Sequence, residues 1–93
     1  MKNLKIEISP DVLSQEVSGE TVLLDIRSES YFGLDPVGTR IWELLHENGN
    51  LEPTYKTMLD EYDVDAGQLA SDLTALVEKL EEAGLVNTSP TDS

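Results

Sequence analysis

The dipeptide Asp35-Pro36 divides this chain into two halves with different hydrophobic patterns. Aspartate is a favoured cap for the N-terminus of a helix, and proline is well tolerated at the first helical position. Strand-like segments precede the dipeptide, and segments with helical spacing follow it. A chain of 93 residues fits one domain. The sequence therefore predicts an α+β fold, in which a three-stranded antiparallel N-terminal sheet is followed by three helices in the outline of a winged helix-turn-helix.

The N-terminal half predicts a meander of three strands joined by short turns. The expected strands are residues 21–27, residues 31–34 and part of either residues 4–8 or residues 12–17. In the central strand, Val22, Leu24 and Ile26 share one face. Because a small sheet is not stable alone, we expect this apolar face to pack on the helices.

The C-terminal half predicts three helices. They are expected from Asp35-Pro36 to Gly49, from residue 52 or 53 to Tyr62, and from Asp65 to Gly84. Trp42 lies beside apolar positions of the first helix and is expected in the core. The third helix has an apolar stripe made of Leu69, Leu73, Leu76, Val77 and Leu80. Residues 1–86 are expected to form the domain, and residues 87–93 a disordered tail.

The charge of the chain limits its partners. The formal net charge is −13, and from Ile41 onward only Lys56 and Lys79 are basic, against twelve acidic residues. Such a surface repels nucleic acid and anionic lipid, so neither is expected as a partner. The acidic residues either form a solvated surface or steer a basic partner. With no apolar span, no signal-peptide pattern and no cysteine, the chain is expected in the cytoplasm.

No residue constellation predicts catalysis, a metal site or a cofactor. His46 is the sole histidine, and without cysteine there is no thiolate nucleophile or ligand. The acidic run at residues 60–65 lacks the glycine and glutamate spacing of a calcium loop. A winged-helix DNA-binding regulator is disfavoured because the third helix, which would read the bases, has Lys79 as its only basic residue. A hydrolase subunit is disfavoured by the missing nucleophile and base. We therefore expect a binding module and not an enzyme.

The segment at residues 31–34 has the character of an edge strand. An edge strand presents unpaired backbone groups to which another strand can add. Gly33 leaves room for the approach of a second backbone. Strand addition obtains affinity from main-chain hydrogen bonds and specificity from a neighbouring groove.

Four segments in this order resemble the PqqD-like family. They are VLLD at residues 22–25, YFGLDPVG at 31–38, IWELL at 41–45 and LVEKLEEAGLV at 76–86. Many members of the family have asparagine where this chain has Asp35, and both residues cap helices well. The resemblance extends over roughly residues 12–86 and implies a fold of three strands followed by three helices, in agreement with the patterns above.

The resemblance implies a recognition element for ribosomally synthesised precursor peptides. Such proteins bind the leader segment of a precursor and present it to processing enzymes. The chain is most similar to the small stand-alone B-protein half of lasso-peptide systems, so the implied partners are a leader peptide, a separate leader protease and the cyclase. A peptide chaperone in quinone-cofactor or other modified-peptide biosynthesis is the alternative.

The family implies a binding site between the third strand and the third helix. The leader adds to the strand and lies in the groove against the helix. Carried over to this chain, the peptide-binding residues are Glu29, Ser30, Tyr31, Phe32, Gly33, Leu34 and Asp35 on the strand side, and Leu69, Asp72, Leu73, Leu76, Val77 and Leu80 on the helix side. Leu76 and Val77 lie on adjacent sides of the stripe, and the sequence leaves open which of them borders the groove.

Overall fold

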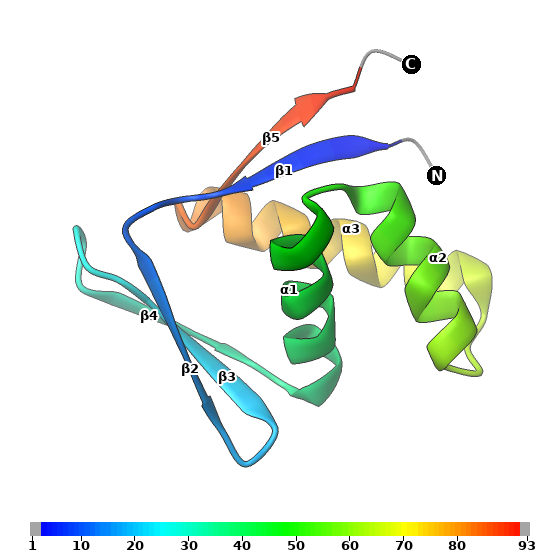
Figure 1. Ribbon diagram of the computed structural model, residues 1–93, viewed down its shortest axis with the longest axis horizontal. Coiled ribbons are helices and arrows are strands. Elements are labelled where there is room, and N and C mark those ends of the chain that lie inside the picture. Colours follow the sequence, from blue (N-terminus) through cyan, green and yellow to red (C-terminus); the bar gives the residue numbers. More distant parts are fainter. Residues whose placement is uncertain (1–2, 92–93) are drawn as a thin grey trace.

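The computed structural model describes residues 3–91 and contains strands and helices in the expected order (Figure 1). Both of the alternative first strands are present, and a further strand, β5, follows the third helix. The elements are β1 (Leu4–Ile8), β2 (Val12–Val17), β3 (Glu20–Asp25), β4 (Ser30–Leu34), α1 (Pro36–Asn48), α2 (Leu51–Glu61), α3 (Ala66–Glu82) and β5 (Val86–Pro90). The predicted α+β class and its three helices are confirmed. None of the helices within this part of the chain has the length and apolar character that a membrane span requires.

The predicted meander is the sheet β2-β3-β4, and both of its pairs are antiparallel. Ser18 and Gly19 form the two-residue turn between β2 and β3, and both have positive φ, as the preferred hairpin turn requires. Between β3 and β4, the Asp25 carboxylate accepts a hydrogen bond from the N–H of Arg27 at 3.0 Å, and this bond lowers the pKa of Asp25. These two short turns join strands that are neighbours in the sheet, so β4 lies at its edge.

The two additional strands form a separate sheet, in which β1 pairs antiparallel with β5. The prediction of a disordered tail is therefore wrong for residues 87–90, whereas residues 92 and 93 lie outside the described residues. Gly84, at φ 77°, reverses the chain after α3, and the buried side chains of Leu85 and Val86 anchor the new strand. The polar residues that follow satisfy their backbone groups by pairing with β1.

The central strand β3 turns the opposite face to the helices from the one expected. Leu23, with no exposed surface, lies on the inner face, whereas Val22 and Ile26 are exposed and Leu24 is half-buried. In the observed register Leu23 lies opposite Phe32 of β4, so the two apolar side chains share the inner face. Strand alternation could not choose between the faces, since the choice depends on this pairing.

The first and third helices begin where their capping residues predict. The Asp35 carboxylate accepts the N–H of Gly38 at 2.7 Å, and the Asp65 carboxylate accepts the N–H of Gln68 at 2.8 Å. Trp42 is 5% exposed, which confirms its place in the core. The core joins all three helices to both sheets. The second helix begins at Leu51, slightly earlier than expected.

An ion pair joins α1 to α2 and predicts a pH dependence of stability. The Arg40 guanidinium donates to Glu61, with Nε 2.8 Å from Oε1, and lowers the pKa of this carboxyl below its ordinary value of 4.5. A depressed pKa in the folded state contributes stability above pH 4.5 that is lost as the pH falls through the folded value. Glu61→Gln should therefore destabilise the protein near neutral pH and do so less at about pH 2, because protonation of the Glu61 carboxyl at low pH weakens the ion pair that the variant lacks. Urea unfolding at the two pH values tests this expectation, and an equal loss at both would contradict it.

Candidate peptide-binding groove

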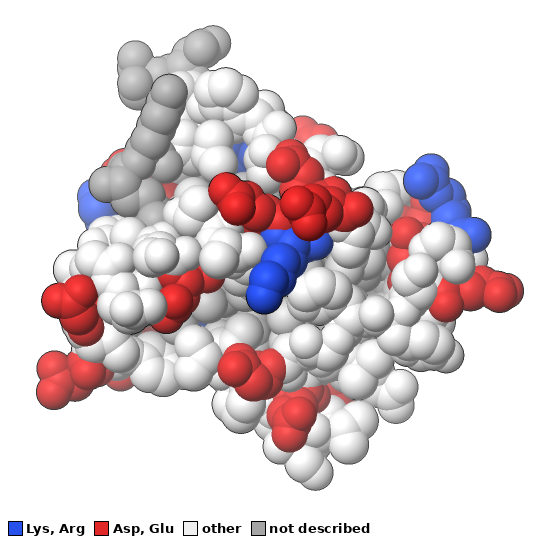
Figure 2. Space-filling view, turned by 180° about the vertical axis from the view of Figure 1, so that it is seen from behind, with Lys and Arg blue, Asp and Glu red and all other residues white. Residues whose placement is uncertain are grey.

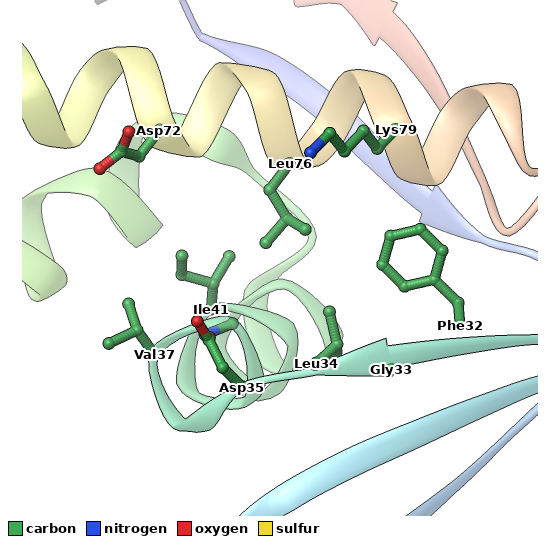
Figure 3. A pocket seen from close by; sticks show the side chains of 10 residues that line it. Phe32, Gly33, Leu34, Asp35, Val37, Ile41, Asp72, Leu76 and Lys79 are labelled. Carbon is green, nitrogen blue, oxygen red and sulfur yellow. The ribbon is translucent and has the colours of Figure 1, made fainter.

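A groove of about 530 Å³ lies between β4, the start of α1 and the middle of α3 (Figure 3). It is lined by Phe32, Gly33, Leu34, Asp35, Val37, Gly38, Ile41, Asp72, Leu76 and Lys79. The hydrogen bond that caps α1 at Asp35 fixes the direction in which α1 leaves β4. It thereby sets how these two elements stand relative to each other at the groove. The groove runs along the strand edge.

β4 is an edge strand, because the order of its sheet is β2-β3-β4. The two-residue turn between β2 and β3 closes on a hydrogen-bonded pair that includes Glu20. From Glu20 onward, every second residue of β3 forms its backbone hydrogen bonds with β2. The residues between them form their backbone hydrogen bonds with β4. Leu23 is therefore expected to bond to Phe32, which leaves the N–H and C=O groups of Tyr31 and Gly33 directed at the open edge. These are the groups that an added strand would use.

The floor of the groove is apolar. Leu34 and Ile41 are 4% and 3% exposed, and Phe32 and Leu76 are half-buried. Figure 3 shows Leu76 projecting from α3 toward Ile41, with Phe32 at one end of the groove. A floor of this kind favours apolar side chains from an occupant.

The groove has charged groups at both ends. Asp72 lies near the end formed by Val37 and Asp35, and Lys79 lies near Phe32 (Figure 3). The carboxylate of Asp72 accepts a hydrogen bond from Nε2 of Gln68 at 2.8 Å. Both Asp72 and Lys79 are exposed to solvent.

Six of the residues predicted for the site line this groove, and they come from both predicted walls. They are Phe32, Gly33, Leu34, Asp35, Asp72 and Leu76. Four further predicted residues lie in the core instead, with exposed fractions of 6% or less: Leu69, Leu73, Val77 and Leu80. Of the adjacent pair at the stripe, Leu76 thus borders the groove and Val77 faces the core.

The other three predicted residues lie at or beyond the start of β4. Tyr31 is 75% exposed, and its register partner is Leu24, which places its side chain on the face of the sheet away from α1. Glu29 lies in the turn before β4 with φ 59°, and Ser30 pairs with Asp25. Of these three residues only Tyr31 directs its backbone groups at the open edge, and the lining of the groove includes none of their side chains.

Four lining residues were missed: Val37, Gly38, Ile41 and Lys79. Their spacing contained a signal, because Val37 and Ile41 are four residues apart, and Lys79 follows Leu76 by three. Residues three or four apart share a helix face. The opposition of the two helix faces, however, depends on the tertiary packing.

Groups of the kind used in metal or nucleophilic chemistry do not converge on the groove. Within residues 3–91, no three histidine, aspartate or glutamate side chains are placed to hold a metal ion together. His46 lines a different hollow, beside Ser14 and Trp42, and is exposed.

Comparison with known proteins identifies relatives of the chain. Residues 20–86 match the family model described as coenzyme PQQ synthesis protein D (PqqD). The solved structure of TbiB1 in complex with the TbiA(beta) leader peptide is 36% identical, with a TM-score of 0.83, over 92% of this chain and 99% of that one. A lasso peptide synthetase B1 complexed with its leader peptide is 25% identical, with a TM-score of 0.80, over 89% of this chain and 98% of that one. None of the curated proteins matches.

Proposed function

The chain belongs to the PqqD family, and from this premise we propose that it binds the leader segment of a ribosomally made precursor peptide and delivers it to processing enzymes. The leader adds as a strand to β4 and places apolar side chains over the floor of the groove. Its partners are the separate leader protease and the cyclase of a lasso-peptide pathway in the cytoplasm. The domain, which extends through β5 to Pro90, acts as a recognition module and carries out no chemistry itself.

The observation that supports this proposal most strongly is the coincidence of an open strand edge with an apolar groove. Strand addition needs both, the edge for main-chain hydrogen bonds and the groove for side chains. Two relatives that are similar over most of this chain are solved with leader peptides. One of them is a lasso peptide synthetase B1, which favours the lasso pathway over the quinone-cofactor pathway named by the family model.

Binding to duplex DNA is disfavoured by the charge of α3. This helix has four acidic side chains and a single basic one, Lys79. On the face of the molecule opposite to that of Figure 1, acidic groups gather in several places and basic groups in few (Figure 2). A reader of DNA needs cations for phosphates and base edges.

A charge placed on the floor should weaken leader binding. In Leu76→Asp the new carboxylate would replace an apolar side chain of the floor and would lose its water when the bound peptide covers it, and we expect the affinity to fall by about tenfold to a hundredfold. The measurement is a titration of the labelled precursor leader, with amide shifts mapped by NMR. The control is Ala75→Asp, which adds the same charge at the adjacent, exposed position of α3. Equal losses in the two variants, or shifts that spare β4, would contradict the proposed mode of binding.

A further inference from the structure

Lys79 stands apart from the other basic residues of the described chain. Residues 3–91 contain five lysines and arginines. Four of them have a carboxylate oxygen within 4 Å, namely Lys5, Arg27, Arg40 and Lys56. Lys79 has none, although acidic residues outnumber basic ones about threefold. Lys79 lies toward the Phe32 end of the groove, and its ammonium group extends from there toward Leu76 (Figure 3), where a bound peptide could reach it.

The opposite end of the groove is anionic. Asp35 and Asp72 both line it, and within residues 3–91 neither forms an ion pair. The carboxylate of Asp35 accepts the N–H of Gly38, and that of Asp72 accepts Nε2 of Gln68. These neutral donors leave both negative charges available to a cation of the occupant.

The spacing of the two charged ends sets the spacing of the complementary charges. Asp72 and Lys79 are seven positions apart on one helix, which corresponds to about 10 Å along its axis. A strand rises about 3.4 Å per residue, and only alternate side chains face α3. The matching residues of the peptide are therefore two or four positions apart. At a spacing of four, the residue midway between them also faces α3 and would lie over Leu76, which favours an apolar side chain there.

The direction of the added strand sets the order of its charges. β4 runs from the Lys79 end of the groove toward the Asp72 end, as Figure 3 shows. A strand that adds antiparallel to β4 therefore begins near Asp72 and ends near Lys79. We propose that the groove selects leader segments in which a basic residue precedes an apolar residue and an acidic residue follows it. This inference rests on the proposed function and adds the class of sequence that is recognised.

The test separates charge order from net charge, because a protein with a net charge of −13 attracts any basic peptide. One synthetic peptide has the central sequence lysine-valine-leucine-valine-glutamate, and its isomer has the two charged residues exchanged. Exchange turns two attractive contacts into two repulsive ones. Each exposed charge pair contributes modestly, so we expect the first peptide to bind roughly tenfold more tightly than its isomer. Amide shifts measure both affinities, including weak ones.

An exchange of charges in the protein should reverse this preference. The double variant Asp72→Lys with Lys79→Glu is expected to bind the isomer more tightly. The matched control is Asp60→Lys with Lys56→Glu, which makes the same exchange at exposed positions of α2 outside the groove and should leave the preference unchanged. The preference should also shrink as salt is raised to about 1 M.

Several results would overturn the inference. Equal binding of the two peptides, a preference for the isomer, or a preference that survives high salt would each exclude selection by charge order. Failure of both peptides to shift β4 and α3 would show that this charge pattern does not direct binding. The proposed function would survive any of these results if the precursor leader still bound in the Leu76 experiment.

Discussion

Replacing Gly33 by proline should weaken leader binding by at least about a hundredfold. The N–H of Gly33 is directed at the open edge of β4, and proline has no such donor. Loss of this hydrogen bond leaves a carbonyl of the bound peptide unpaired, which costs about 1–3 kcal/mol, and the proline ring also clashes with the added strand. Because Gly33 is not expected to donate to β3, the substitution spares the bonds of the sheet. The measurement is a titration of the labelled leader, with circular dichroism to verify the fold.

The matched control for this prediction is Gly33→Ala. A Cβ atom at Gly33 would meet no heavy atom within 4 Å, and alanine keeps the N–H donor. We expect the affinity of this variant to stay within about twofold of that of the unmodified protein, since no hydrogen bond is lost. If the Gly33→Pro variant bound the leader as tightly as the Gly33→Ala variant, main-chain pairing of the leader with β4 would be excluded.

Replacing Trp42 by alanine should lower the free energy of unfolding by about 3–5 kcal/mol. The indole is 5% exposed and belongs to the core cluster that joins α1 to the other elements. Domains of this size are stable by only about 5–15 kcal/mol, so the loss is a large part of the total. The melting temperature should fall by more than about 12 °C, because each kcal/mol corresponds to about 4–8 °C. Thermal unfolding followed by circular dichroism provides the measurement.

Val37→Ala is the control on the same helix. The side chain of Val37 is 43% exposed, so its truncation should change stability by no more than about 0.5 kcal/mol. An unchanged melting temperature in Trp42→Ala would mean that the ring is not packed and is free for another role.

All three helices, and the boundaries of α1 and α3, could be predicted because their signals are local. Asp35 and Asp65 cap helices through hydrogen bonds that span three residues, and Gly84 ends the third helix by its positive φ. The walls of the site followed from the family resemblance, and six of the predicted residues line the groove. Each of these predictions depends on residues that are neighbours in the sequence or on a motif of adjacent residues.

The tertiary structure alone decided which side of each element faces the core. Val22 and Leu23 are both apolar, and the register with β4 buries only Leu23. Leu76 and Val77 are likewise both apolar, and the packing of α3 buries Val77 more deeply and leaves Leu76 on the groove.

The pairing of β5 with β1 could not be predicted from the sequence either, because it depends on a contact between distant segments. Its residues are mostly polar, so no hydrophobic pattern marks it as a strand, and its partner lies at the other end of the chain. The sequence by itself determined the ends of α1 and α3, because their caps depend on residues close together along the chain, and it determined the excess of negative charge, because this follows from composition. Register, strand face and the opposition of groove walls were decided only in the tertiary structure, because they depend on contacts between segments far apart in the chain.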